Sequence, residues 1–326
     1  MDKLSRRSVL WAGLSLAAAG PVLAQTRPQE TQTEATATAQ RAQAIGQPAE
    51  LIEDPRVETL DLTVSGHTWR LLIGAPAVEV PPEGYSVLYV LDGNACFPML
   101  WHAREQLAPK APVVIVGVGY PITQRFDVVR RYWDLTPETA AEYLRMRGSA
   151  ESRSTGGQAV FLDFLAQEVK QAISQRFKVN PKQQTLFGHS LAGLFTLYTL
   201  FNRPTLFQNY VAADPAIWWN NRSILHEESA FRAGVSIAGG AVVDPLRLLV
   251  EKSGQAHGSH TREEIQEGID IAKALGGRLA NIKGLDVFYR DFPEHSHPSM
   301  IEPSVRDALL FHMHQQLPED VVKLTA

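Results

Sequence analysis

Short apolar runs separated by helical patterns make up the chain after about residue 50. The first two runs, Val57–Val64 and Thr68–Ile73, flank a Ser-Gly-His turn and predict an antiparallel hairpin. Six later runs are almost continuously apolar, which is typical of strands buried on both faces of a parallel sheet. They are Ser86–Leu91, Val113–Val118, Gln184–Phe187, Asn209–Ala213, Leu246–Val250 and Leu285–Tyr289.

Helical periodicity fills several of the intervals between these runs. Apolar residues from Phe161 to Ile173 recur at spacings of one, three and four. Thr261-Arg-Glu-Glu264 is a capping box, and it opens a helix that we expect to end at Gly276-Gly277. A last helix is expected over Ser304–Gln315. Strands that alternate with helices predict an α/β fold, with a mainly parallel sheet, an N-terminal antiparallel hairpin and helices on both faces.

The N-terminus carries the pattern of an export signal. Ser5-Arg6-Arg7-Ser8-Val9-Leu10 is a twin-arginine motif, and an apolar stretch follows it to Ala19. Val22-Leu23-Ala24 offers small residues at the positions that a signal peptidase reads. An uncleaved membrane anchor is the alternative, but the apolar run is short for a bilayer core of about 30 Å. We therefore expect a signal peptide over residues 1–24, export by the twin-arginine route to the periplasm or beyond, and no stable membrane insertion afterwards.

Residues 25–48 are rich in Thr, Gln and Ala and almost free of large apolar side chains. Burial cannot offset the ordering entropy of such a segment, so we expect a flexible linker. Residues 49–326 then form one catalytic domain. The whole chain has 326 residues, is 44% hydrophobic and has a formal charge of −4, without the basic excess of a nucleic-acid-binding protein. Its only cysteine is Cys96, so no internal disulfide can form.

The segment from Thr185 to Leu194 carries the clearest chemical signal. It reads Thr-Leu-Phe-Gly-His-Ser-Leu-Ala-Gly-Leu, an apolar run followed by Ser190 and then by small residues. A sharp strand-to-helix turn that exposes a nucleophilic serine needs small residues two positions before and after it. Gly188 and Ala192 occupy those positions. We predict that Ser190 is a nucleophile, although short Gly/Ser patterns also occur in ordinary loops.

A serine nucleophile needs donors that hold the oxyanion. The run Leu88–Leu91 leads into Asp92-Gly93-Asn94, where the chain can turn its amides inward. The backbone amides of Asn94 and Leu191 are therefore the predicted oxyanion hole. The alternative is that residues 92–94 form only a turn.

The base and the acid are expected after later strands. His297 and His295 both follow the last predicted strand, and we favour His297 because it lies nearer the last helix. Glu251, at the end of the run Leu246–Val250, is the candidate acid, with an ordinary surface residue as the alternative. Gly254 stands where an acid is often found, so a Ser–His dyad without an acid also stays open.

Metal catalysis is disfavoured by the sequence. Its histidine pairs are His257/His260, His295/His297 and His312/His314. The last pair has a spacing of two residues, which separates the side chains on a helix, and no carboxylates cluster around the others. We expect neither a metal nor another cofactor.

Several motifs together resemble the putative-esterase (esterase D-like) branch of the α/β hydrolases, and particularly the periplasmic siderophore-trilactone esterases. The resemblance covers about residues 50–316. Its motifs are Tyr89-Val-Leu-Asp-Gly-Asn94, Gly117-Val-Gly-Tyr-Pro121, Arg131-Tyr-Trp-Asp-Leu-Thr-Pro137, Phe187-Gly-His-Ser-Leu-Ala-Gly-Leu194, Asp214-Pro-Ala-Ile-Trp-Trp219 and His297-Pro-Ser-Met300. It implies an α/β-hydrolase fold, with Ser190 as nucleophile, His297 as base and Arg131 in contact with substrate.

Two departures from that branch stand out. Relatives usually have Gly where this chain has Ala192, and often Ser where it has Asp214. The second departure puts an extra carboxylate near the site and leaves open whether it alters specificity or pKa values. The resemblance also implies a ferric trilactone siderophore as substrate. Trp218 is a candidate for stacking on its aromatic rings, although tryptophans are equally common in cores.

The sequence thus predicts an exported serine carboxylesterase that acts through an acyl-enzyme on a small-molecule ester, and the resemblance implies that this ester is an iron–siderophore complex. A feruloyl or acyl-polysaccharide esterase is the alternative within the same class of enzyme. A non-catalytic protein that binds ligands on a hydrolase scaffold is the alternative outside that class.

Overall fold

The computed structural model describes residues 46–145, 154–256 and 261–325. The predicted signal peptide and residues 25–45 of the predicted linker lie outside these ranges. The end of the linker does pair with the domain, since the Ala49 amide donates to the Thr123 carbonyl (2.8 Å) and the Arg125 amide donates to the Gln47 carbonyl (3.0 Å). In the described ranges we find no helix with the length and apolar character needed to cross a membrane.

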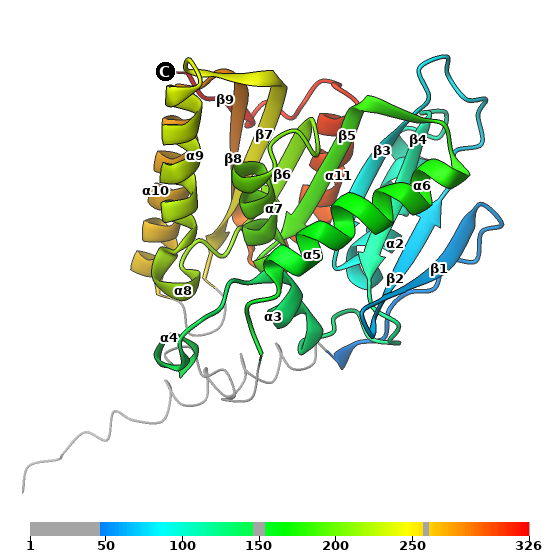
Figure 1. Cartoon of the computed structure of the whole chain (residues 1–326), viewed down its shortest axis with the longest axis horizontal. Coiled ribbons are helices and arrows are strands. Elements are labelled where there is room, and N and C mark those ends of the chain that lie inside the picture. The colour runs from blue at the N-terminus through cyan, green and yellow to red at the C-terminus, as the bar shows by residue number, and fades with distance from the viewer. Residues whose placement is uncertain (1–45, 146–153, 257–260, 326) are drawn as a thin grey trace, which may run out of the picture.

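A nine-stranded sheet in the order β1-β2-β4-β3-β5-β6-β7-β8-β9 forms the centre of the molecule (Figure 1). Its strands are β1 (Val57–Val64), β2 (His67–Gly74), β3 (Tyr85–Leu91), β4 (Val113–Gly119), β5 (Val179–His189), β6 (Asn209–Ala213), β7 (Ala241–Gln255), β8 (Lys283–Ser296) and β9 (Val322–Lys323). The strands from β4 to β8 are parallel, whereas β1, β2 and β9 pair antiparallel at the edges.

Each of the eight predicted runs lies in a strand, and the predicted N-terminal hairpin is β1–β2. The nearly continuous apolar character of the central runs follows from their burial, since every residue of β4 and β6 is buried. Both faces of these strands are covered, which is the reason that parallel sheets lack the polar–apolar alternation of a half-exposed strand. The short edge strand β9 was not expected from the sequence.

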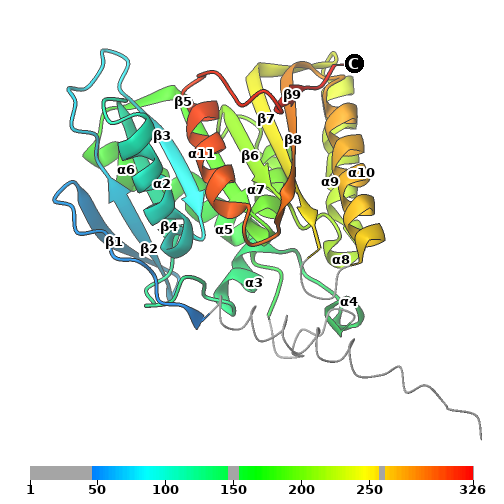
Figure 2. The ribbon, with the colours of Figure 1, turned by 180° about the vertical axis from the view of Figure 1, so that it is seen from behind.

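Helices cover both faces of the sheet. They are α2 (Gly93–Leu107), α3 (Arg130–Leu135), α4 (Ala141–Arg145), α5 (Gln158–Phe164), the π-helical η1 (Leu165–Val169), α6 (Lys170–Arg176), α7 (Leu191–Asn202), α8 (Trp219–Arg222), α9 (Ile224–Ile237), α10 (Arg262–Leu279) and α11 (Ile301–His312). α2 and α11 lie on one face, seen in Figure 2, and α5 to α7, α9 and α10 lie on the other, seen in Figure 1. Two apolar clusters, one on each side of the sheet, form the core.

Two predicted helix boundaries differ from the structure. The capping box of Thr261 and Glu264 is present at the start of α10, but the helix continues past Gly276-Gly277 to Leu279. Burial of Leu275 and Leu279 outweighs the cost of about 1 kcal/mol that a glycine brings to a helix. The last helix begins at Ile301 and ends at His312, three residues earlier at each end than predicted.

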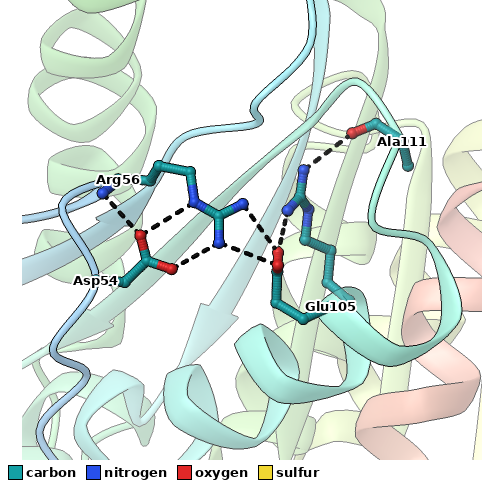
Figure 3. Close-up of polar contacts among 5 residues, drawn as sticks. Asp54, Arg56, Glu105 and Ala111 are labelled. Carbon is teal, nitrogen blue, oxygen red and sulfur yellow. Dashed lines mark hydrogen bonds and ion pairs between the residues drawn. The ribbon is translucent and has the colours of Figure 1, made fainter.

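A polar cluster fastens the segment before β1 to α2 (Figure 3). The Arg56 guanidinium lies between two carboxylates and donates to Asp54 (2.6 Å) and to Glu105 on α2 (3.0 Å). It also lies over the Trp101 ring, 4.8 Å from the ring centroid. The hydrogen bonds from Arg56 lower the pKa of Asp54 to about 2. The chain that enters the sheet is thereby fixed beside α2.

The carboxyl ends of β3 to β8 all meet one edge of the sheet, which is the edge where α/β proteins bind ligands. Figure 1 shows α3 and α4 lying beyond this edge. Both helices belong to the long connection between β4 and β5. Ser190 and His297 directly follow β5 and β8, and Leu191 and Asn94 lie in the first turns of the helices after β5 and β3. Glu251 lies within β7, and Trp218 and Arg131 lie in the connections after β6 and β4.

Candidate active site

Ser190 lies at the turn between β5 and α7 in a strained conformation. Its φ of 63° and ψ of −118° are rare for any residue other than glycine. The neighbouring strand supports it, because the Ser190 amide donates to the Ala213 carbonyl (3.0 Å). The Ser190 carbonyl accepts from Leu194 (2.9 Å) and Ala216 (3.1 Å). Strain that is held in place by so many bonds is typical of a functional residue.

Gly188 shows why this turn needs small residues. A Cβ at this position would lie 2.2 Å from the Ala192 carbonyl oxygen and 2.8 Å from Thr196 Oγ1. Ala192 is itself fully buried. β5 and α7 approach so closely that residue 188 has no room for a side chain, and this approach leaves Ser190 at the tip of the turn.

The amides of Asn94 and Leu191 stand at the starts of two helices, α2 and α7. In the described part of the chain neither amide donates a hydrogen bond to another protein group. The Asn94 side chain is occupied, since it accepts from the Tyr120 amide (2.9 Å) and donates to the carbonyls of Tyr120 and Ile122. Residues 92–94 therefore form the start of a helix rather than a free loop. Because β3 and β5 are parallel neighbours, the two helix starts that carry these amides lie at the same edge of the sheet.

His297 follows β8, and its Nδ1 lies 2.7 Å from Asp214 Oδ2. His295, the other candidate, instead places its Nδ1 3.2 Å from the Ser299 carbonyl and packs against Phe292. The ring of His297 also lies beside that of His189, with 4.4 Å between the centroids. His189 precedes Ser190 in the chain, so this contact brings His297 to the nucleophile turn.

Asp214 is the first residue after β6, and its side chain is only 4% exposed. Besides His297, Ser253 and Lys252 both donate hydrogen bonds to its carboxylate. Burial alone would raise the pKa of Asp214, but the charges and hydrogen bonds of Lys252 and His297 outweigh burial and hold the pKa below its usual range. The carboxylate is therefore ionised at neutral pH.

An ionised carboxylate only accepts hydrogen bonds, so His297 Nδ1 carries the proton that faces Asp214. Nε2 is then left with a lone pair and can act as a base. His189 Nε2 donates to the His297 carbonyl (2.8 Å), which fixes the backbone of His297. Among the described residues no hydrogen bond joins Ser190 Oγ to His297. Such bonds are often long in a site without substrate.

The structure does not bring Glu251 to His297. Glu251 is fully buried within β7, and neither of its carboxylate oxygens has a hydrogen-bond partner in the described chain. Burial and the charge of Asp307 on α11 raise its pKa well above the usual value. Successive side chains of a strand point to opposite faces, so Glu251 faces the α11 side while the next residue, Lys252, faces Asp214. The prediction of Glu251 as the acid is not supported by this geometry.

Gly254, the position where an acid is often found, has no room for a side chain. A Cβ at this position would lie 2.6 Å from Pro293 Cα and 3.2 Å from the Phe292 carbonyl oxygen. β8 fills the space that a side chain would need. The carboxylate arrives from β6 instead, and Ser253 only donates a hydrogen bond to it.

Arg131 and Trp218, the two predicted substrate contacts, lie at the same edge. The Arg131 guanidinium is bound through two bonds to Asp92, at 3.0 Å and 2.7 Å, and Asp92 directly precedes α2. Arg131 therefore holds the start of the predicted oxyanion segment. Trp218 is 40% exposed, and its ring centroid lies 5.5 Å from that of the buried Trp219.

Within the described residues, one set of three potential metal ligands has its ligand atoms within 4.8 Å of one another, namely His189, Asp214 and His297. All three are already engaged in hydrogen bonds, and the Lys252 ammonium beside the carboxylate opposes a second cation. Of the predicted pairs, His257 and His260 lie outside the described residues. His312 is a core residue whose ring nitrogens meet Thr185 (2.7 Å) and Ser86 (2.9 Å).

Comparison with known proteins gives the family. A family model described as putative esterase matches residues 66–246. The chain belongs to the putative-esterase family.

Two curated relatives and one solved structure indicate where this esterase lies within the family. The ferri-bacillibactin esterase BesA of Bacillus subtilis (strain 168) is 32% identical over 77% of this chain and 86% of the relative. The siderophore enterobactin esterase of Emericella nidulans is 31% identical over 69% of this chain and 81% of the relative. The BES protein from Bacillus cereus superposes with a TM-score of 0.68 at 30% identity, over 81% of this chain and 97% of that one. The α/β-hydrolase fold predicted for the esterase is confirmed.

Asp214, His189 and Lys252 are the residues of this esterase site whose part the sequence did not assign. The signal for Asp214 was present, since a carboxylate directly follows the strand run after the nucleophile. Because neighbouring parallel strands end at one edge, that position is adjacent to Ser190. Successive side chains of a strand point to opposite faces, so the strand pattern could have shown that Glu251 and Lys252 lie on opposite sides of β7.

Proposed function

We propose that this esterase hydrolyses ester bonds of ferric siderophores through an acyl-enzyme on Ser190. In the first step Ser190 Oγ attacks the ester carbonyl carbon, and its proton passes to His297 Nε2. Asp214 accepts the Nδ1 proton of His297 and stabilises the imidazolium that forms. The amides of Asn94 and Leu191 donate to the oxyanion.

The tetrahedral intermediate then collapses, and the bond to the leaving alkoxide breaks as His297 returns the proton to that oxygen. A water molecule repeats the sequence on the acyl-enzyme, giving a carboxylic acid and free Ser190. Every proton is carried by His297, so no resident cofactor takes part. Iron belongs to the substrate in this scheme.

The observation that carries the proposal is the 2.7 Å hydrogen bond from His297 Nδ1 to Asp214. It leaves Nε2 unprotonated on a ring that packs against His189, the residue before a serine held in a strained turn, and a serine esterase requires such a pairing of base and serine. The relatives supply the substrate class, since one is named for ferri-bacillibactin and another for enterobactin. Trp218, which is 40% exposed, is the proposed contact for aromatic groups of such ligands, whereas Arg131 is held by Asp92 and supports the start of α2.

A substrate panel tests the proposal. Purified enzyme would be given a ferric catecholate trilactone, a methyl ferulate and an acetylated xylan, with product acids measured by chromatography. We expect the trilactone to be hydrolysed at least about a hundredfold more efficiently than the other two, and Ser190→Ala to lose turnover of all three. Preference for ferulate would favour the feruloyl-type alternative, and binding of the trilactone without any hydrolysis would favour a ligand-binding protein.

We also propose that the chain is exported by the twin-arginine route. Arg6 and Arg7 followed by the apolar stretch to Ala19 support this proposal. Cell fractionation of the full chain and of an Arg6→Lys/Arg7→Lys variant tests it. The full chain is expected in the periplasm and the variant in the cytoplasm; equal distribution of the two would contradict the proposal.

A further inference from the structure

A lysine stands behind the proposed catalytic carboxylate. Lys252 Nζ contacts Asp214 Oδ1, whereas His297 Nδ1 and the Ser253 hydroxyl both contact Oδ2. Each carboxylate oxygen therefore has its own partner. The side chain of Lys252 is 14% exposed and that of Asp214 is 4% exposed. Solvent and salt screen such an ion pair much less than an exposed one.

We propose that Lys252 is a positioning residue, which keeps Asp214 ionised and holds its carboxylate in the orientation that directs His297. The inference rests on the proposed function, because the orientation of His297 matters only when His297 acts as the base. Lys252 itself touches neither Ser190 nor the predicted oxyanion donors in the described structure.

The sheet register puts Lys252 in this place. Ala213 of β6 pairs with Glu251 of β7, so the next residues along the two strands, Asp214 and Lys252, lie side by side. The Asp214 amide also donates to the Glu251 carbonyl (2.8 Å). On the other side α10 presents Gly268, where a Cβ would lie 3.6 Å from Lys252 Nζ. The lysine thus has room to extend to the carboxylate without displacing the helix.

Lys252 supplies a charge that the other neighbours do not. The described groups that face Asp214 come from three parts of the sheet: His189 on β5, Lys252 and Ser253 on β7, and Tyr289 and His297 on or after β8. Burial, together with His297, keeps the pKa of His189 below its usual value. Burial and the nearby Asp291 raise the pKa of Tyr289. His189, Ser253 and Tyr289 are therefore uncharged at neutral pH, and Lys252 is the permanent cation among these groups.

Loss of the lysine charge has a predictable sign. The burial that now opposes ionisation of Asp214 would lose its main counterweight, so a larger fraction of Asp214 would be protonated at a given pH. A protonated Asp214 no longer accepts the Nδ1 proton of His297, so the acid limb of activity must move to higher pH.

The test compares pH profiles of kcat, with p-nitrophenyl acetate as substrate, for wild type, Lys252→Met and Lys252→Arg. We expect the acid limb of Lys252→Met to move up by at least about one pH unit. At pH 7 its kcat should fall by about tenfold with little change in KM, a part of the roughly 10⁴-fold loss expected when the acid itself is removed. Lys252→Arg should recover most of both. Lys323→Met, which removes an exposed cation of β9 that pairs with Asp286 of β8, is the matched control and should keep the wild-type profile.

A double variant separates positioning from folding. In an Asp214→Asn background the Lys252→Met change should have no further effect on kcat, because the group that it acts through is gone. If Lys252→Met does not fold, Lys252→Gln removes the charge while keeping a hydrogen-bond donor. An unshifted acid limb in a folded neutral variant would overturn the inference and leave the proposed function intact. Retained turnover in Ser190→Ala would instead contradict the proposed function.

Discussion

Replacing Asp214 by asparagine separates a catalytic triad from a Ser–His dyad. The side chains have the same shape, so the fold around β6 should be kept. Asparagine can present its amide to His297 Nδ1, which would then have to accept a hydrogen bond and leave the proton on Nε2. His297 would then carry its proton on Nε2, the nitrogen that should accept the proton of Ser190.

The size of the effect follows from the site geometry. The carboxylate oxygen lies 2.7 Å from Nδ1, which puts the centres of the two charges about 4 Å apart when His297 is protonated. At an effective dielectric constant of about 20 this attraction is about 4 kcal/mol. Each 1.36 kcal/mol is about a factor of ten in rate, so the charge alone accounts for about 10³-fold in kcat. The wrong tautomer brings the expected loss to about 10³- to 10⁴-fold.

The assay is steady-state hydrolysis of p-nitrophenyl acetate at pH 8, with Ser190→Ala as the baseline. Glu251→Gln is the matched control, because this carboxyl lies in the next strand but faces α11, and its kcat should stay within about threefold of wild type. Asp214→Asn should also lower the free energy of unfolding by about 1–3 kcal/mol, since Lys252 loses its partner. A folded Asp214→Asn with kcat within tenfold of wild type would refute the triad and favour a dyad.

Three further predictions concern the turn, the oxyanion segment and the core. Gly188→Ala should destabilise the protein by about 1–3 kcal/mol or more and abolish most activity, because the added Cβ overlaps the Ala192 carbonyl. Thermal melts and kcat measure these two effects, and a variant with the wild-type melting temperature and kcat would contradict the prediction. Arg131→Gln should lower kcat by about tenfold or more by releasing Asp92 before α2, and an effect confined to KM would instead identify a simple substrate contact. Burial lowers the pKa of His312 to about 3 in the folded protein. As the pH falls below about 6.5, the unfolded chain therefore protonates His312 while the folded chain does not. Stability should therefore decline by up to about 1.4 kcal/mol per pH unit between pH 6 and 4 in urea titrations, and His312→Gln should reduce that slope.

Much of the fold could be predicted because burial leaves a direct mark on the sequence. The central strands are apolar on both faces, and the turn at Ser190 needs small residues two positions before and after the serine. Helix ends were harder to predict. Gly276-Gly277 reads locally as a stop, but the packing of Leu275 and Leu279 against the rest of the protein carries α10 past it.

The proposed acid, Asp214, was not assigned from the sequence because its position depends on contacts between strands. Glu251 and Lys252 are neighbours in sequence and point to opposite faces of β7. One of them is therefore a buried carboxyl and the other is the partner of Asp214, and the strand register decides which is which. The steric block at Gly254 comes from β8, about 40 residues later in the chain. Asp214 could be recognised only once the order of strands placed β6 beside β5.

Trapping the acyl-enzyme tests the central claim most directly. Enzyme mixed with a ferric catecholate trilactone would be quenched with acid during the first turnover, digested and analysed by mass spectrometry. We predict a single acyl adduct on the peptide that contains Ser190, absent from Ser190→Ala and formed more slowly in Asp214→Asn than in the wild type. Hydrolysis of the trilactone with no adduct on any serine, or with an adduct elsewhere, would contradict a mechanism that begins at Ser190.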